Sequence, residues 1–207
     1  DSWSDTLEED TPNYFLFNIQ EYDLNNISKY LQSEAAINPE FTPLIRGRLL
    51  SAKRFNSDQL SSENLMEREA NLTWSESLPI SNSISKGKWW SQPDTKSEVS
   101  VDREVAESMN LNIGDELLFS AGGSNFNATV TSFREIEWES FSPNFFFILS
   151  PSLGKTLPNS YITSIKIPSD VNIMKKFTQQ FPTISSVDLG AVILQIRNTI
   201  SSASLAV

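Results

Sequence analysis

Three glutamates at alternate positions, Glu135, Glu137 and Glu139, are the residues whose spacing most directly suggests chemistry. Side chains two residues apart on a strand point to the same side, so all three carboxylates would face one way. Such a cluster could hold a hard cation or supply the acid and base of a hydrolase. A simpler interpretation, which we favour, is a solvated strand face with Ile136 and Trp138 buried on the opposite side.

The 207 residues include no histidine and no cysteine, which excludes most other catalytic chemistry. Their absence excludes Ser-His-Asp and Cys-His machinery, Cys or His zinc sites and thiol redox centres. The phosphate-binding patterns GxxxxGK[ST] and GxGxxG are also absent, as is the GxSxG nucleophile turn. We therefore predict a non-enzymatic protein with no catalytic residue, no cofactor and no metal.

Aromatic residues in segments with turn character are the alternative candidates for a functional surface. Trp89, Trp90, Trp138 and Phe141 each carry a large apolar face that could contact a partner or an apolar cargo, or could fill the core. The 26 acidic residues outnumber the 16 basic ones, which gives a formal charge of −10. This balance argues against nucleic-acid binding and against docking on anionic lipid by charge alone.

Two segments, one near each end of the chain, show the pattern of a β-α-β unit. Apolar residues recur at helical spacing within each unit, between runs rich in branched and aromatic residues. Strands are expected over 13–19 and 41–55 around a helix over 20–36, and over 161–167 and 183–189 around a helix ending at about 180. Two such units commonly combine into a ferredoxin-like split β-α-β sandwich.

The middle of the chain has a different composition and turn pattern. Residues 57–97 are rich in serine and asparagine, and the residues after them are predicted to be mostly β. Strands are expected over 98–101, 116–121 and 126–136, with a short helix over 102–109 that Asp102 caps and a hairpin connection at Gly122–Asn125. We predict an α+β fold in which residues 63–140 form a β subdomain inserted into a sandwich made of 1–62 and 141–207.

The ends of the chain indicate a segment of a longer protein. The sequence begins with Asp1 and has no apolar stretch long enough to cross a membrane. Apolar residues from Leu189 follow helical spacing to the last residues without a stop signal. We expect this helix to continue in the native protein.

Several motifs in order resemble the YbbP-like branch of the FtsX/MacB-type ABC transporter permeases. They are Pro43–Arg48, Arg68–Trp74, Gly87–Trp90, Val99–Asp102, Asn112–Asp115, Thr131–Arg134 and Trp138–Phe146. The resemblance spans almost the whole chain. It implies an extracytoplasmic domain that lies between two transmembrane helices and projects into the periplasm, with a porter-like part made from both ends and a sabre-like β insert.

The function implied by this resemblance is mechanical. A separate cytoplasmic ATPase would drive the transmembrane helices, which would pass motion to the periplasmic domains of two permease copies. The implied cargo is hydrophobic or lipid-like, and a periplasmic esterase is a candidate partner. Two alternatives remain open: a free-standing periplasmic module that binds an apolar ligand, and a hydrolase that uses Glu135, Glu137 or Glu139.

Overall fold

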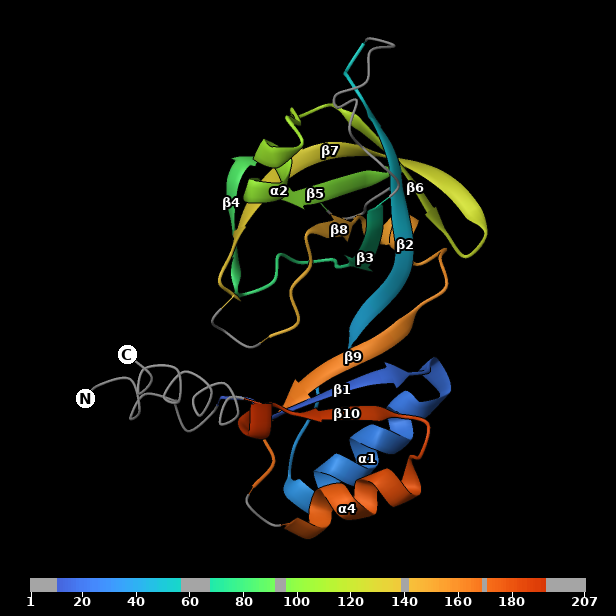
Figure 1. Ribbon diagram of the computed structural model, residues 1–207, viewed down its shortest axis with the longest axis vertical. Coiled ribbons are helices and arrows are strands. Elements are labelled where there is room, and N and C mark those ends of the chain that lie inside the picture. Colours follow the sequence, from blue (N-terminus) through green and yellow to red (C-terminus); the bar gives the residue numbers. More distant parts are fainter. Residues whose placement is uncertain (1–10, 57–67, 92–95, 139–141, 169–170, 193–207) are drawn as a thin grey trace, which may run out of the picture. The chain divides into compact units, whose positions relative to one another are not determined.

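A computed structural model describes residues 11–56, 68–91, 96–138, 142–168 and 171–192. The chain divides into two compact units (Figure 1). Unit 1 comprises Asp1–Thr42, Phe141–Pro143 and Ser160–Val207, and unit 2 comprises Pro43–Ser140 and Asn144–Asn159. Within the described residues, no helix combines the length and apolar character that a membrane crossing requires.

Unit 1 is built on a three-stranded antiparallel sheet in the order β10-β1-β9. Its strands are β1 (Tyr14–Ile19), β9 (Ser160–Ile165) and β10 (Ser185–Asp188). Because β9 and β10 both run antiparallel to the central β1, they are parallel to each other. The helix α4 (Val171–Gln180) joins them, which makes β9-α4-β10 a split β-α-β arrangement with β1 inserted between its strands.

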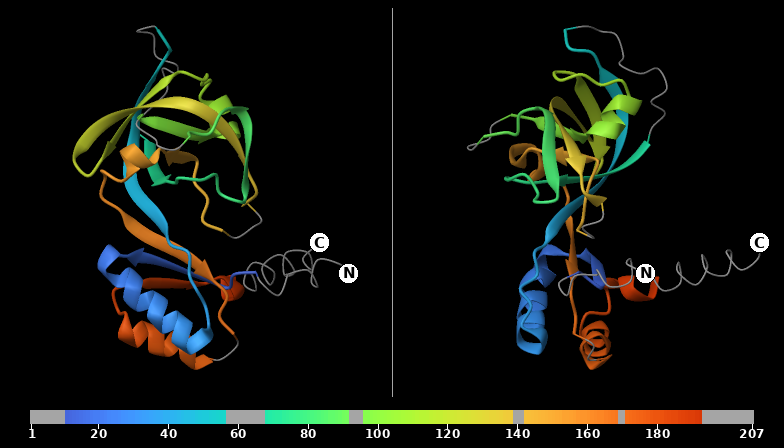
Figure 2. Two further views of the ribbon diagram at one scale, coloured as in Figure 1. Left: turned by 180° about the vertical axis from the view of Figure 1, so that it is seen from behind. Right: turned by 90° about the vertical axis from the view of Figure 1, so that its left-hand side faces the viewer.

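Two helices bury their apolar faces against this sheet. Helix α1 (Leu24–Ala35) follows the short 3₁₀ turn η1 (Glu21–Asp23), and α1 and α4 lie side by side in both views of Figure 2. Apolar side chains recur every three or four residues along each helix, so they form one stripe. That stripe packs with the strand residues Leu16, Ile19 and Ile165 into a single core.

The first and the last described segments of unit 1 lie next to each other. Tyr14 at the start of β1 pairs with Asp188 at the end of β10, and the amide of Leu189 donates to the carbonyl of Asn13 at 2.8 Å. Residues 189–192 are helical, as predicted, and the remainder of that predicted helix lies outside the described residues.

Unit 2 is a closed barrel of six strands (Figure 1). Each strand pairs with two others in the ring β2-β3-β8-β5-β7-β6, and β6 returns to β2. The strands are β2 (Thr42–Lys53), β3 (Arg68–Trp74), β5 (Glu98–Asp102), β6 (Glu116–Ala121), β7 (Ser124–Ile136) and β8 (Phe147–Leu149). Closure leaves none of the six as a free edge, and their apolar side chains form the second core.

Three shorter elements complete unit 2. The strand β4 (Asn82–Gly87) pairs with the last part of β7, beyond the part that pairs with β6. The helix α2 (Arg103–Ser108) begins at Asp102, whose carboxylate accepts from the amide of Val105 at 3.1 Å, so the predicted N-cap is confirmed. The other short helix is α3 (Pro151–Gly154).

The β6–β7 hairpin is also confirmed. Ala121 pairs with Ser124, and the two glycines between them have φ values of +59° and +79°. Two-residue turns of this kind require left-handed backbone at both positions, which glycine adopts without strain.

The predicted organisation differs from the structure in one respect. The strand expected over 41–55 is present as β2, but β2 pairs with β3 and β6 in the barrel. The boundary between units therefore lies at residues 42 and 43 rather than at 62, and residues 144–159 belong to the barrel unit. Local pattern indicates a strand but not its partner, because pairing depends on residues far away in sequence.

Candidate functional site

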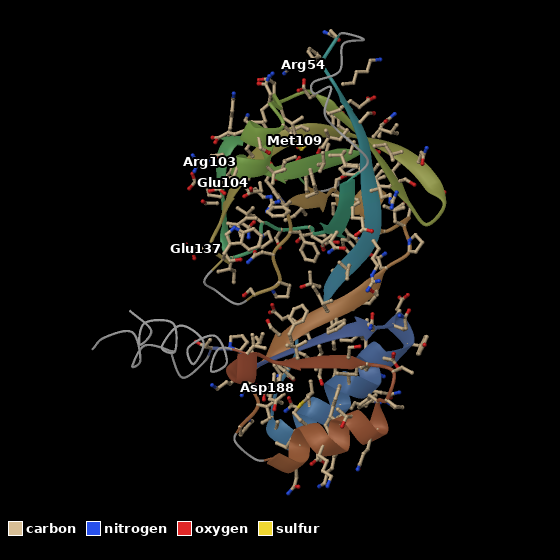
Figure 3. The ribbon with its side chains drawn as sticks, in the orientation of Figure 1. Arg54, Arg103, Glu104, Met109, Glu137 and Asp188 are labelled. Atoms are coloured by element: carbon tan, nitrogen blue, oxygen red, sulfur yellow. The ribbon has the colours of Figure 1, made fainter. Side chains whose placement is uncertain are left out.

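Of the three alternating glutamates, the structure describes Glu135 and Glu137, and only Glu135 lies on a strand. β7 ends at Ile136, so Glu137 follows the strand, and Glu139 lies outside the described residues. Glu135 is exposed and pairs with Arg103 on α2, with 3.2 Å between the carboxylate and Nε; Figure 3 labels Arg103 and Glu137. Among the described residues, no group of three or more His, Cys, Asp or Glu side chains is placed to hold a metal ion.

Trp138 is not buried opposite these glutamates, which corrects the favoured interpretation. Its side chain is 52% exposed, because the strand has ended and the chain turns. Its ring contacts that of Phe146 edge to face, with 5.4 Å between centroids, and Phe146 is itself 48% exposed. Two large aromatic rings thus pack on each other at the surface instead of entering the core.

A third apolar side chain lies at the same end of the β4–β7 pair. The amide of Glu137 donates to the carbonyl of Ser81 at 2.8 Å, which extends the pairing past Asn82 and Ile136. Ile80 comes directly before Ser81 and is fully exposed. We call Ile80, Trp138 and Phe146 the apolar patch. Ile80 and Phe146 were not among the predicted site residues, although the Pro79-Ile80 turn is a local signal for an exposed apolar residue.

A completely buried arginine holds the chain that carries Phe146. The guanidinium of Arg134, on β7, donates to the carbonyls of Phe145 and Phe146 at 2.8 and 3.0 Å. It also donates to the Ser100 hydroxyl at 2.9 Å and to the Asn82 side chain. Burial lowers the pKa of Arg134 to about 10, and the nearby Asp102 carboxylate opposes that shift. These bonds offset part of the cost of removing a charge from water.

The same segment is tied down by two further sets of bonds. The Asp102 amide donates to the Phe146 carbonyl at 2.8 Å. The side chains of Ser81 and Asn82 both donate to Asn144 Oδ1, at 2.9 and 3.0 Å. The backbone beneath the apolar patch is therefore fixed, while the Phe146 ring remains half-exposed.

The second pair of predicted site residues stands apart from the apolar patch. Trp89 and Trp90 follow β4, and their rings lie 3.9 Å apart between centroids at 34°. Each indole N–H donates to a carbonyl of the 75–76 segment, Trp89 to Glu76 at 3.0 Å and Trp90 to Ser75 at 2.9 Å. Because both donors are used, the two indoles present only apolar ring surface to other groups.

These tryptophans line a cavity of about 490 Å³ in unit 2. Two lysines, Lys88 and Lys96, and one acid, Glu98, also line it. The remaining lining residues are Gly87, Ser91, Ile113, Gly114, Thr129, Val130 and Thr131. We call this space the tryptophan cavity; its volume lies in the range of about 300–1,000 Å³ that is usual for small-molecule sites.

A glycine lets the tryptophan segment approach β7 closely. Gly87 has φ of +77°, and a Cβ there would lie 2.2 Å from the carbonyl oxygen of Thr131. The amide of the next residue, Lys88, donates to that same carbonyl at 3.1 Å. A side chain at position 87 would push the segment away from β7 and open the wall of the tryptophan cavity.

Of the four predicted surface residues, the structure places Trp89 and Trp90 in one site and Trp138 in another, and Phe141 lies outside the described residues. No individual role was predicted for Arg134, Lys88 or Lys96. A single arginine in a strand carries no signal of burial, so only the structure could identify the buried guanidinium.

No family model matches the sequence. The chain is 33% identical over 196 residues, 95% of its length, to the uncharacterized ABC transporter permease YbbP of Escherichia coli (strain K12). This chain is similar to one segment of an ABC transporter permease. The resemblance predicted from the sequence motifs is thereby confirmed. The chain spans 24% of the length of that permease relative.

One solved structure is also similar in part, a domain of a protein described as a permease from Porphyromonas gingivalis. It has 10% sequence identity and a TM-score of 0.38, over 84% of this chain and 85% of the other. A TM-score this low does not establish a shared fold.

Proposed function

We propose that this chain is the extracytoplasmic, non-catalytic domain of an ABC transporter permease and works in the periplasm as part of an inner-membrane protein. The observation that carries the proposal is the 33% identity to a permease segment over 95% of the chain. In this proposal, unit 1 is the porter-like part and the unit 2 barrel is the sabre-like part.

The positions of Asn13 and Leu189 in unit 1 support the attachment of both flanking segments to one membrane. Leu189 and Asn13 are hydrogen-bonded neighbours, so the segments before β1 and after β10 start from the same end of two paired strands. Transmembrane helices that flank the 207 residues on both sides would be connected to these neighbouring points through residues 1–12 and 190–207. Motion of either helix would then be passed to paired strands.

In the proposed mechanism, a separate ATPase subunit moves the transmembrane helices of two permease copies. The domain passes this motion to a hydrophobic or lipid-like cargo or to a periplasmic partner, for which an esterase is a candidate. The proposed contact surface is the apolar patch, together with Trp89, Trp90 and Phe141. Within the apolar patch, Trp138 and Phe146 are half-exposed aromatic side chains, and the backbone of Phe146 is fixed by hydrogen bonds. Such side chains suit these contacts, because little conformational entropy is lost on binding.

Motion can be measured in the whole permease reconstituted with its ATPase. The 207-residue chain has no cysteine, so Asn25→Cys on the exposed side of α1 would add one labelling site to this domain. Spin labels there should show an inter-copy distance distribution that shifts between the nucleotide-free and ATP-bound states. An unchanged distribution, with ATP hydrolysis intact, would contradict a role in transmitting motion.

The contact surface needs its own test in the same whole permease. Replacing Trp138 and Phe146 by serine should abolish the transport phenotype while leaving folding and ATP hydrolysis intact. Tyr22→Ser is the matched control, because Tyr22 in unit 1 is also an exposed aromatic, at 79%. A double variant with full transport would exclude the apolar patch as the contact surface.

A free-standing periplasmic module for an apolar ligand is the second candidate, and the tryptophan cavity favours it. The two candidates differ in what flanks the chain. Transmembrane segments encoded on both sides would exclude the free-standing module, and their absence from the complete gene would exclude the permease.

A further inference from the structure

We propose that Asn13 and Asp188 form a clasp, which fastens the segments before β1 and after β10 to the sheet of unit 1 so that both segments and the sheet move as one body. The clasp positions the point at which motion enters the domain, and its part in transmitting motion rests on the proposed function. The fastening itself is a property of unit 1 and can be measured in the 207-residue chain alone.

The residue directly before β1, Asn13, uses both its main-chain and its side-chain hydrogen-bonding groups. Its amide donates to the carbonyl of Ile165 at 3.0 Å, and its carbonyl accepts from the amide of Leu189 at 2.8 Å. Its side chain donates through Nδ2 to the carbonyl of Ile167 at 2.9 Å and accepts through Oδ1 from the amide of Ile167 at 2.7 Å. One residue therefore joins the start of β1 to the ends of both neighbouring strands, β9 and β10.

A proline explains why a side chain is needed at this point. In the register of β1 and β9, Tyr14 lies opposite Ile165, which would place Pro12 opposite Ile167. Proline has no amide hydrogen, so the backbone of residue 12 cannot donate to the Ile167 carbonyl. Ile167 is only 3% exposed, and its backbone groups need partners because the residue is shielded from water. The Asn13 side chain supplies both partners, since it carries the same donor and acceptor as a peptide group.

Asp188 fastens the segment that follows β10. Its Oδ1 accepts from the amide of Ala191 at 3.0 Å, which is an N-cap bond to the helical residues 189–192. Its Oδ2 accepts from the hydroxyl of Tyr14 at 3.3 Å, and Figure 3 labels Asp188. The helical turn after β10 is thereby tied to β1, the strand that the preceding segment enters.

The clasp lies where a force on the flanking segments would act. β1 starts and β10 ends at the same end of two antiparallel strands, so moving residues 12 and 190 apart would separate this pair one bond after another. Asp188 opposes the separation by its bond to Tyr14, and Asn13 keeps the start of β1 in the sheet by its bonds to Ile167. Hydrogen-bond networks within rigid elements carry coupling between distant sites. A closed clasp therefore passes motion of either segment to all three strands.

Amide hydrogen exchange of the 207-residue chain, measured for single residues by NMR, tests the clasp. Asn13→Ala leaves the main-chain acceptor of Leu189 in place, and Asp188→Ala leaves both partners of Ile167 in place. A clasp predicts that the Ile167 and Leu189 amides both exchange about fivefold faster in either variant, because its bonds open together. If Asn13→Ala affects only Ile167 and Asp188→Ala affects only Leu189, the two ties are independent and the clasp is overturned.

Two control variants separate the clasp from a general loosening of the sheet. Ser185→Ala removes a side-chain bond at the other end of the β1–β10 pair, where the Asn18 side chain donates to the Ser185 hydroxyl at 2.9 Å. Exchange at Ile167 and Leu189 should stay unchanged in this variant, and equal acceleration there would overturn the clasp. Asp188→Asn keeps a capping oxygen, and its amide can donate to the tyrosine hydroxyl, so both amides should stay protected.

The part of the clasp in transmission is measured in the whole permease reconstituted with its ATPase, with the spin label at Asn25→Cys. Asn13→Ala should reduce the ATP-dependent shift of the inter-copy distance to less than about half, with ATP hydrolysis intact. Tyr30→Phe removes one buried hydrogen bond of unit 1 away from the clasp and should leave the shift unchanged. A full shift in Asn13→Ala, or equal reductions in both variants, would overturn the role in transmission.

The clasp and the proposed function can fail separately. If the two amides exchange independently while the unchanged permease moves with nucleotide, the clasp is wrong and the permease function stands. If the two amides respond together but the unchanged permease does not move with nucleotide, the permease mechanism is wrong and the fastening of the two segments stands.

Discussion

Unit 1 and unit 2 bury the apolar faces of their sheets in two different ways. Unit 1 covers one face of three strands with α1 and α4, and its core is almost entirely apolar. Unit 2 closes its sheet on itself and buries polar groups as well as apolar ones. Of the nine buried polar or charged residues among those described, all except Thr163 lie in unit 2.

The different numbers of buried polar groups reflect the kinds of segment that each unit must stabilise. Packing of aromatic and aliphatic side chains is enough to keep two helices on a sheet, where each element is regular. The barrel must also fix irregular segments, such as the chain that carries Phe146, whose backbone carbonyls need donors. Arg134 supplies these donors from a strand, which ties the apolar patch to the barrel wall.

The largest effect is expected from Phe177→Ala in α4. Phe177 is completely buried, and its ring lies 5.6 Å from that of Tyr30 and 4.9 Å from that of Phe181. Removing it should lower the free energy of unfolding of unit 1 by about 4 kcal/mol, through lost burial and the cavity left behind. Urea unfolding followed by circular dichroism of the helices measures this change.

Unit 2 provides the internal control for that variant. All described tryptophans lie in unit 2, so in a Trp3→Phe background tryptophan fluorescence reports on the barrel. Its urea midpoint should stay constant in Phe177→Ala. A fluorescence transition that shifts as much as the helical one would show that the two units unfold together, and the comparison between separate cores would fail.

Arg134→Met should have a smaller but still large effect, confined to unit 2. The methionine fills much of the space, yet it removes the guanidinium donor from Asn82 Oδ1 and from the Phe145 carbonyl. The Phe146 carbonyl keeps its bond from the Asp102 amide. We expect a loss of about 3 kcal/mol in the free energy of unfolding, seen by fluorescence. Arg103→Met, an exposed arginine on α2, should change it by less than about 0.5 kcal/mol.

The arginine variant also tests its link to the apolar patch. Phe146 should become more mobile, so its ring contact with Trp138 should weaken and the fluorescence of the folded protein should change. If Arg134→Met keeps the original stability and fluorescence, the guanidinium does not stabilise the segment that carries Phe146.

Tyr30→Phe should have the smallest effect. It measures how much one buried hydrogen bond contributes to the free energy of unfolding of unit 1. The Tyr30 hydroxyl donates to the carbonyl of Ile173 at 2.7 Å, and burial raises its pKa above the usual value, with a further contribution from Glu34. Losing this one neutral bond should cost about 1 kcal/mol. A loss as large as that of Arg134→Met would show that unit 1 also depends on buried polar bonds.

The local patterns predicted much of the secondary structure. Period-two alternation and helical spacing indicated β1, α1, β9, α4 and β10 to within a few residues, and turn chemistry indicated the β6–β7 hairpin. The strands β3, β4 and β8 were missed. β4 reads NSISKG and β8 has three residues, so neither carries a period long enough to detect.

The amino-acid sequence by itself determined most of the helices and strands, the lack of histidine and cysteine chemistry and the resemblance to a permease segment, because these depend on residue type and near neighbours. The tertiary structure alone decided that β2 belongs to a closed barrel, that Arg134 is buried and that Val130 and Thr131 of β7 line the same cavity as Trp89 and Trp90. These features arise from contacts between residues far apart in the chain, where burial and partner choice are settled by packing rather than by local preference.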